Sequence, residues 1–157
     1  MQNRFLNNKE IKKIRESFLE EYGYFWQEDY AYVLSEKERL SIISKDIAAM
    51  DLKQLRIDKI GLYVAEIKNN QVRLSKEGAQ LLAQEAGKHK IALKNIHRLS
   101  AKEVQDYFKG LDLAKELGAE SKLIILQHHD NVIGCARYKD GKILNFLPKI
   151  HRGEVIL

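Results

Sequence analysis

The sequence predicts an α+β protein with two domains: an α/β domain over residues 1–87 and a mixed β-barrel domain over residues 88–157. Helical and strand patterns alternate up to Gly87, and mostly strand patterns follow the short basic segment 88–90. The charge balance changes at the same place, with 14 Lys and Arg against 14 Asp and Glu before it and 13 against 8 after it. These observations place a domain boundary after Gly87.

The N-terminal domain is expected to begin with a helix and a strand. Over residues 8–21, apolar residues recur with helical spacing at Ile11, Ile14, Phe18 and Leu19. Residues 30–34 have the composition of a strand. Ser35 and Glu38 then have the spacing of a capping box, which predicts a second helix over residues 38–50.

A hairpin and a further helix are expected next. Strand patterns over residues 59–67 and 71–74 flank Asn69 and Asn70, which tolerate the left-handed backbone angles of a tight turn. Ser75 is a good N-cap for a helix over residues 76–86, which Gly87 is expected to end.

The C-terminal domain begins with a predicted strand over residues 91–96 and a short helix over residues 102–109. Ser100 and Glu103 form a capping box for this helix, and Gly110 closes it. Strands over residues 122–128, 132–138 and 142–147 follow, with turns at 130–131 and 140–141, until Pro148 ends the ladder. This arrangement predicts a three-stranded meander within a compact mixed β-barrel, rather than a βαβ sheet.

The composition is that of a globular, basic protein, with 45% hydrophobic and 31% charged residues and a pI near 9.2. The longest apolar runs are too short to cross a bilayer, and residues 1–6 lack the apolar region of a signal peptide, so a soluble cytoplasmic protein is expected. Cys135 is the only cysteine, which excludes an internal disulfide and a cysteine-based zinc cluster. It is interpreted as a small buried strand residue.

Signatures of catalysis are mostly absent. Glycine-rich nucleotide loops, zinc-protease motifs and nucleophile elbows do not occur. The best remaining group is His128, His129 and Asp130 near Cys135, but neighbouring side chains on a strand point to opposite faces, so only one histidine could approach the thiol. The same geometry counts against metal binding by His128 and His129, and His151 could complete a site only by an accident of folding. No enzymatic activity, metal or cofactor is therefore expected.

The segment 131–152 carries five cations opposed only by Asp140, namely Arg137, Lys139, Lys142, Lys149 and Arg152. The whole net charge of +5 belongs to the C-terminal domain, which indicates an anionic partner such as a phosphate backbone. Edge-strand lysines that prevent sheet pairing are the alternative for the hairpin. For Tyr138 the sequence favours neither of two roles, packing in the core or stacking on a base. Phe146 is expected in the core.

Aromatic residues also gather between positions 22 and 32, around Trp26. Glu20, Glu21, Glu28 and Asp29 lie among them and would repel phosphate. We therefore interpret this cluster as core with a possible protein-contact surface, not as a nucleobase platform.

Several segments resemble one family of RNA-binding domains. VIGCARYKDGKILNFLPKIHRGE resembles the end of PUA domains, with its N-x-x-P-K-x-x-R tail, and LSAKEVQDYFKGLDL is similar to the PUA helix that lines the RNA groove. Upstream, YAYVLSEKERLSIIS and KIGLYVAEIKNNQVRLSKEGAQLLA resemble the pre-PUA domain of Nip-type ribosome-biogenesis factors. The C-terminal tail is closer to the RNA-binding extension of RsmF/Nop-type rRNA methyltransferases.

This resemblance implies a pre-PUA α/β domain over residues 1–87 and a PUA-like pseudo-barrel over residues 88–157 that grips structured RNA without catalysis. The resemblance implies RNA contacts at Lys109, Gly110, Arg137, Lys139, Lys149 and Arg152, and the charge pattern of the hairpin adds Lys142 to the predicted contacts. The chain departs from the family at residues 111–117, where Asp112 and Glu116 stand in place of a glycine-rich loop. It also has no counterpart of the methyltransferase domain, so the resemblance assigns no methyl transfer.

Two functions follow as hypotheses. The first is an accessory factor of rRNA or tRNA maturation, or of ribosome biogenesis, that holds structured RNA by its phosphates while the N-terminal domain docks a protein partner. The alternative is a protein-interaction adaptor whose basic edge binds an acidic partner.

Overall fold

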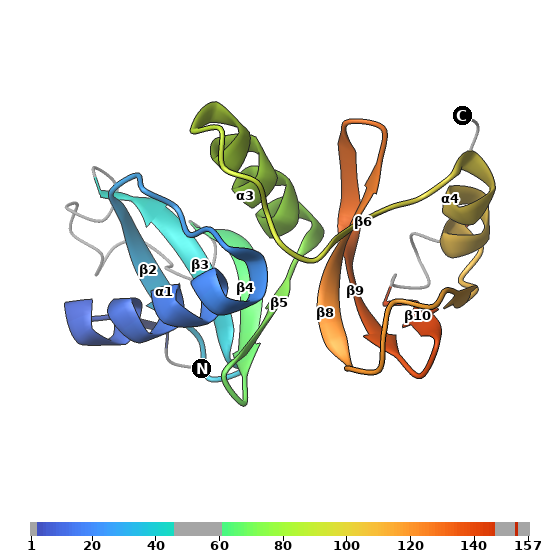
Figure 1. Ribbon diagram of the computed structural model, residues 1–157. Coiled ribbons are helices and arrows are strands. Elements are labelled where there is room, and N and C mark those ends of the chain that lie inside the picture. The colour runs from blue at the N-terminus through green and yellow to red at the C-terminus, as the bar shows by residue number, and fades with distance from the viewer. Residues whose placement is uncertain (1–2, 46–60, 147–152, 154–157) are drawn as a thin grey trace. The chain divides into compact units, whose positions relative to one another are not determined.

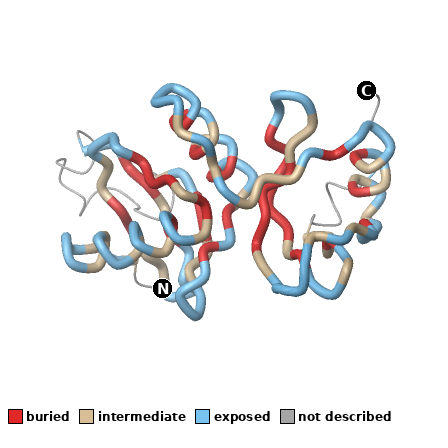
Figure 2. Tube along the Cα trace, in the orientation of Figure 1, coloured by how far each residue is buried: buried red, intermediate tan, exposed pale blue. Residues whose placement is uncertain are grey.

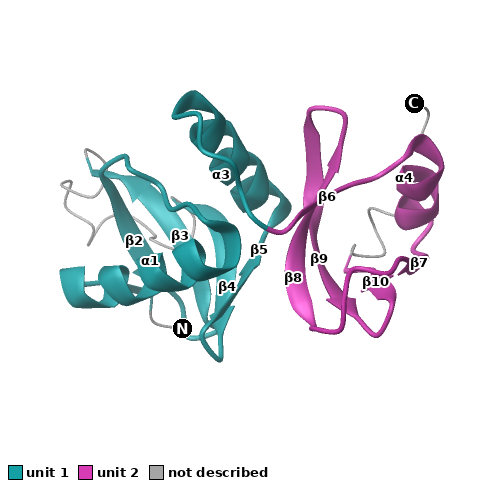
Figure 3. Cartoon of the chain, in the orientation of Figure 1, with its two compact units in different colours: residues 1–94 teal, residues 95–157 magenta. Residues whose placement is uncertain are grey.

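The computed structural model describes residues 3–45, 61–146 and 153, and the chain divides into two compact units, residues 1–94 and 95–157 (Figure 3). The division lies beyond the predicted boundary after Gly87. Helix α3 (Lys76–Lys88) continues past that glycine and has His89 as its C-cap. Ile91 and Lys94 then donate backbone hydrogen bonds to Ala86 and Tyr22, which ties residues 89–94 to the N-terminal unit.

The N-terminal unit is built on an antiparallel sheet. In the described part of the chain this sheet has five strands in the order β1 (Arg4–Phe5), β2 (Tyr30–Leu34), β3 (Arg39–Ser44), β4 (Leu62–Lys68) and β5 (Gln71–Leu74) (Figure 1). Each strand pairs with the next along the chain. Among the described strands, each pairing therefore joins strands that are neighbours in the sequence.

The first predicted helix is confirmed as α1 (Asn8–Tyr22). Asn7 and Glu10 form a capping box at its start, and Gly23 ends it in the left-handed conformation with φ 78°. Phe18 and Tyr22 lie on its buried face. They join the aromatic cluster of residues 24–32, whose members Tyr24, Phe25, Trp26 and Tyr32 are all buried. The interpretation of this cluster as core is confirmed.

The predicted helix over residues 38–50 is wrong where the structure describes it, because β3 occupies residues 39–44. Ser35 and Glu38 form a hairpin turn instead of a capping box. Glu38 has a left-handed φ of 62°, and Ser35 Oγ accepts a hydrogen bond from the backbone N–H of Arg39. Leu40, with β-branched Ile42 and Ile43, is buried in a strand that pairs on both sides, and this burial overrides the local cap signal. Residues 46–50 lie outside the described residues.

The predicted hairpin and third helix are confirmed as β4, β5 and α3. Asn69 and Asn70 both have left-handed φ values, 52° and 62°, as a two-residue turn of this kind requires. The Ser75 side chain caps α3 by accepting a hydrogen bond from Gly78. At Gly78 the helix touches β4, because an added Cβ would lie 2.0 Å from the carbonyl oxygen of Val64.

Side chains of α1 cover the outer edge of β5. Tyr22 Oη donates a hydrogen bond of 2.5 Å to the carbonyl oxygen of Val72. Glu21 Oε2 accepts a hydrogen bond of 2.9 Å from the backbone N–H of the same residue. Both main-chain groups that Val72 turns away from β4 are therefore satisfied by helix side chains.

The C-terminal unit contains a curled mixed sheet and one described helix (Figure 1). In order along the sheet, the strands described are β6 (Ile96–Arg98), β8 (Lys122–His128), β9 (Asn131–Lys139), β10 (Lys142–Leu144) and β7 (Leu113–Ala114). The predicted meander is confirmed as β8, β9 and β10. One connection differs from the prediction: β6 runs parallel to β8 with α4 (Ala101–Phe108) between them in the chain, as in a βαβ crossover.

The core of this unit lies between α4 and one face of the sheet. It consists of Leu99, Val104, Tyr107, Leu113, Ile124, Leu126, Ile133, Ala136, Tyr138 and Ile143. Figure 2 shows the buried residues concentrated along β8 and β9. Within the described ranges, no helix is long and apolar enough to cross a membrane.

Three boundaries in the C-terminal unit differ from the prediction. The strand expected over residues 91–96 begins only at Ile96, because Lys90 and Asn95 have left-handed φ values of 57° and 56°. The first meander turn is centred on His129, with φ 52°, so Asn131 already belongs to β9. Strand β10 ends at Leu144 because Asn145 leaves the ladder to bind the end of α4.

Candidate nucleic-acid interface

Three of the predicted contact residues share one face of the sheet. Arg137 and Lys139 alternate along β9 with buried Ala136 and Tyr138, so they point away from the core cluster. Lys142 of β10 lies directly opposite Lys139 in the register and therefore projects from the same face. Lys139 and Lys142 are exposed, whereas Arg137 is half-buried and its Nη1 donates a 3.3 Å hydrogen bond to Ser121 Oγ.

The other described pair, Lys109 and Gly110, lies at the end of α4. This helix packs through Val104 and Tyr107 on the core side of the sheet. Gly110 has a φ of 90°, a conformation that favours glycine, and Lys109 is the exposed C-cap. The structure therefore divides the predicted contacts into two groups on different sides of the sheet. Lys149 and Arg152 lie outside the described residues.

Asn145 fixes the loop that carries Lys109 and Gly110. Its Nδ2 donates hydrogen bonds of 2.6 Å to the carbonyl oxygen of Tyr107 and 3.0 Å to that of Leu111. Gly153 adds a third connection by donating its backbone N–H to the carbonyl oxygen of Phe108 at 2.7 Å. Two residues of the C-terminal tail, Asn145 and Gly153, therefore bind the end of α4. Sequence reasoning missed this positioning role, although Asn145 is the first residue of the N-x-x-P-K-x-x-R pattern.

The two acids that depart from the family pattern take part in internal hydrogen bonds. Asp112 Oδ1 accepts a 2.8 Å hydrogen bond from the backbone N–H of Asn145. Glu116 Oε1 accepts one of 3.3 Å from the backbone N–H of Gly118 and lies 3.3 Å from Tyr138 Oη. Both carboxylates therefore help to shape the segment that follows α4.

Tyr138 belongs to the core and does not offer its ring to a base. It is fully buried, and its Oη donates a 2.8 Å hydrogen bond to the carbonyl oxygen of Gly118. The same oxygen accepts a 3.0 Å hydrogen bond from the backbone N–H of Leu117. Of the two roles that the sequence left open for Tyr138, the structure selects packing. Phe146 is half-buried.

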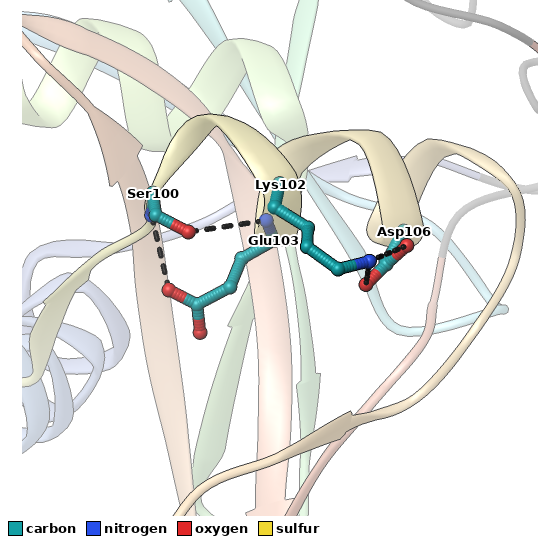
Figure 4. Close-up of polar contacts among 4 residues, drawn as sticks. All are labelled: Ser100, Lys102, Glu103 and Asp106. Atoms are coloured by element: carbon teal, nitrogen blue, oxygen red, sulfur yellow. Dashed lines mark hydrogen bonds and ion pairs between the residues drawn. The ribbon is translucent and has the colours of Figure 1, made fainter.

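Other cations near α4 are already paired. The predicted capping box is confirmed, with Ser100 and Glu103 exchanging hydrogen bonds of 3.0 and 3.2 Å (Figure 4). Lys102 pairs with Asp106 at 3.3 Å, and Lys115 with Glu103 at 3.2 Å. Burial alone would raise the pKa of Glu103, but the hydrogen bonds from Ser100 and Lys115 outweigh it and lower the pKa below its usual value. Lys102 and Lys115 are thus less available to an external anion than Lys109.

His128 and Cys135 lie at different positions along the β8–β9 pair. His128 Nδ1 lies 2.8 Å from the carbonyl oxygen of Leu99, and its ring packs on His129. Cys135 is buried and stands opposite Ile125, whereas His128 stands opposite Asn131. Among the residues that the structure describes, no group of three or more His, Cys, Asp or Glu is arranged to hold a metal ion.

Comparison with known families identifies the C-terminal unit. Residues 94–152 match a family model described as the methyltransferase RsmF PUA domain, and no curated protein matches the chain. The match begins where the structure divides the chain and covers the helix, the hairpin and the tail discussed above. It does not reach the N-terminal unit, whose predicted pre-PUA identity stays a prediction. The C-terminal unit of this α+β chain is therefore a PUA domain similar to that of the methyltransferase RsmF.

Proposed function

We propose that the chain binds structured RNA through its PUA domain and acts in the cytoplasm as a non-catalytic accessory factor of rRNA or tRNA maturation or ribosome biogenesis. The match of residues 94–152 to the RsmF PUA domain carries the proposal. The charge distribution supports it, because the net charge of +5 lies in the C-terminal part of the sequence.

The β9–β10 hairpin supports an anionic ligand on physical grounds. Lys139 and Lys142 stand directly opposite each other, and like charges at opposed positions destabilise a hairpin. In the described parts of the chain, no carboxylate lies within salt-bridge distance of either lysine. A phosphate group bound between them would remove this repulsion.

At the end of α4, RNA would be contacted through a side chain. The backbone N–H groups of Lys109, Gly110 and Leu111 donate to carbonyl oxygens of α4 itself, so they are not available to a phosphate. The exposed Lys109 ammonium therefore provides the positive charge at this position. Because Asn145 fixes the loop, little backbone conformational entropy would be lost when RNA binds there.

A triple variant tests the proposal. The combined changes Arg137→Ala, Lys149→Ala and Arg152→Ala are expected to weaken binding of a stem-loop RNA by at least about tenfold while the thermal midpoint stays within a few degrees. Filter binding and differential scanning fluorimetry measure the two quantities. The matched control replaces three exposed lysines of α1, Lys9, Lys12 and Lys13, by alanine. Equal RNA affinity in both variants would contradict the proposal.

Purification of the unaltered chain separates RNA binding from the adaptor alternative. An excess of absorbance at 260 nm that RNase removes supports RNA as the partner. If this excess is absent and the chain captures an acidic protein that the triple variant does not retain, the adaptor is supported instead.

A further inference from the structure

The N-terminal unit contains a pocket that RNA binding leaves unexplained. Its volume is about 630 Å³, within the range of pockets that hold small ligands or short peptide segments. Residues of β1, α1, β2 and the segment that joins α1 to β2 line it, together with Lys45 and Ile91. None of them lies among the predicted RNA contacts.

Apolar side chains form the rim of this pocket. Phe5 is 37% exposed and Leu19 is 44% exposed, and both belong to the pocket lining. Large apolar side chains that flank a concave surface together mark a binding site more strongly than single exposed ones. The rim therefore suits an apolar side chain of a ligand.

The pocket walls carry hydrogen-bond donors that lack acceptors. Trp26 Nε1 and Tyr32 Oη are buried and have no hydrogen-bond partner among the described residues. The Arg15 guanidinium lies 5.5 Å from the centroid of the Phe25 ring, and in the described ranges it has no carboxylate within salt-bridge distance. Since indole N–H and guanidinium groups only donate, the complementary ligand must bring acceptor oxygens.

The same walls disfavour a nucleic acid. Phe25 stacks on Tyr32 with centroids 5.5 Å apart and also carries Arg15 over its ring, so these ring faces are not free to stack on a base. Glu28 and Asp29 line the pocket as well, so a chain with one phosphate per nucleotide would bring several negative charges next to them, whereas a peptide can place a single carboxylate at Arg15. A peptide avoids both problems, because its main chain is uncharged and presents carbonyl oxygens.

We propose that this pocket binds an extended peptide segment of a protein partner. One apolar side chain of the peptide sits between Phe5 and Leu19, main-chain carbonyl oxygens accept hydrogen bonds from Trp26 and Tyr32, and a carboxylate pairs with Arg15. Because both donors are buried, this mode of binding requires the pocket walls to adjust so that the peptide reaches them. The inference goes beyond the proposed function and is independent of it.

Peptide selection on the full chain tests this inference, with a display library of random twelve-residue peptides as the probe. Trp26 is the only tryptophan, so its indole N–H gives a unique nuclear magnetic resonance signal. Selected peptides are expected to contain an apolar residue and an acid, to shift this signal, and to bind the Phe5→Ser, Leu19→Ser variant at least about tenfold more weakly. The control is Leu111→Ser, an exposed leucine of the other unit.

The inference would be overturned if no peptide were enriched on the unaltered chain relative to the Phe5→Ser, Leu19→Ser variant (the rim variant). It would also be overturned if the selected peptides bound both proteins equally, or if they left the indole signal of Trp26 unmoved. A shift caused by the stem-loop RNA instead would assign the pocket to RNA. If the rim variant fails to fold, Arg15→Gln replaces it, since Arg15 is exposed. A negative result for peptide binding does not bear on the proposed RNA binding, because that activity is tested separately with the Arg137, Lys149 and Arg152 triple variant.

Discussion

Single side chains position the candidate RNA surface, and Asn145 is the clearest example. Asn145 directly follows β10, and its amide binds the carbonyl oxygens of Tyr107 and Leu111, which lie 38 and 34 positions earlier in the sequence. No local pattern reveals such a contact, because it depends on how the sheet brings distant segments together. The Ser100–Glu103 capping box, in contrast, was predictable because both partners lie within one helical turn.

Replacing Asn145 by alanine is expected to destabilise the protein by about 1–3 kcal/mol, because the carbonyl oxygens of Tyr107 and Leu111 each lose the hydrogen bond from the Asn145 amide. Urea denaturation followed by circular dichroism measures this loss. Gln105→Ala, an exposed change on the same helix, should alter the free energy of unfolding by less than about 0.5 kcal/mol. Similar effects of both changes would show that Asn145 does not fix the loop.

His97 makes stability depend on pH. Burial lowers its pKa below the usual 6.5, and the Lys115 ammonium lowers it further, while the Glu103 carboxylate opposes the shift. Between 6.5 and the lower folded pKa, the unfolded chain binds more protons than the folded one. The contribution of His97 to the free energy of unfolding is therefore complete above pH 6.5 and is lost as the pH falls from there through the lower pKa of the folded state.

Urea titrations at several pH values between about 5 and 8 measure this dependence. His97→Gln should flatten the curve in the acidic half of the range. His129→Asn, at an exposed turn position with left-handed φ, is the control variant, since asparagine tolerates that conformation. A slope that survives His97→Gln would assign the dependence to other groups.

At the scale of elements, local signals predicted most helices and hairpins, and tertiary pairing decided the rest. Asn69 and Asn70 specify their turn because few residues tolerate its backbone angles. The segment after Ser35 has an equally good cap signal for a helix, yet it forms β3 because it pairs with a strand on each side. Local propensity predicts structure only weakly where a segment can pair with a strand on each side.

Two glycines of α3 should respond in opposite ways to the same substitution. Gly78→Ala places a methyl group against the Val64 carbonyl and is expected to destabilise the N-terminal unit by more than about 2 kcal/mol. Gly87→Ala meets no atom within 4 Å and should stabilise the helix by about 0.5–1 kcal/mol. Thermal unfolding of both variants checks the pair. A destabilising Gly87→Ala would contradict the assigned backbone.

At the scale of the whole molecule, the uneven charge distribution was the most useful sequence observation. It pointed to the C-terminal part before any element was placed, and the family match falls on the same residues. Which cations share a surface could not be predicted, because it depends on strand register: Lys139 and Lys142 share a face, while Lys109 lies on the other side of the sheet. The pocket beside Trp26 also escaped prediction, since it needs side chains from three elements.

The net positive charge of the C-terminal unit should make its RNA affinity strongly dependent on salt concentration. Each phosphate contact contributes about 0.7–0.9 to the slope of log K against log salt concentration. The triple variant that lacks Arg137, Lys149 and Arg152 should therefore have a slope smaller by about 2–3. Binding measured from about 50 to 300 mM KCl gives both slopes. An unchanged slope would mean that these three cations do not contact phosphate.

The side chains of α1 that cover β5 also limit how other molecules can attach to the N-terminal unit. Tyr22 and Glu21 occupy the outward main-chain groups of Val72, so at that point an incoming strand finds no free hydrogen-bonding partner. Continuation of the sheet into a neighbouring molecule, the usual route to fibrous aggregates, is blocked there. A partner that meets this edge at Val72 must then recognise side chains instead of main-chain groups.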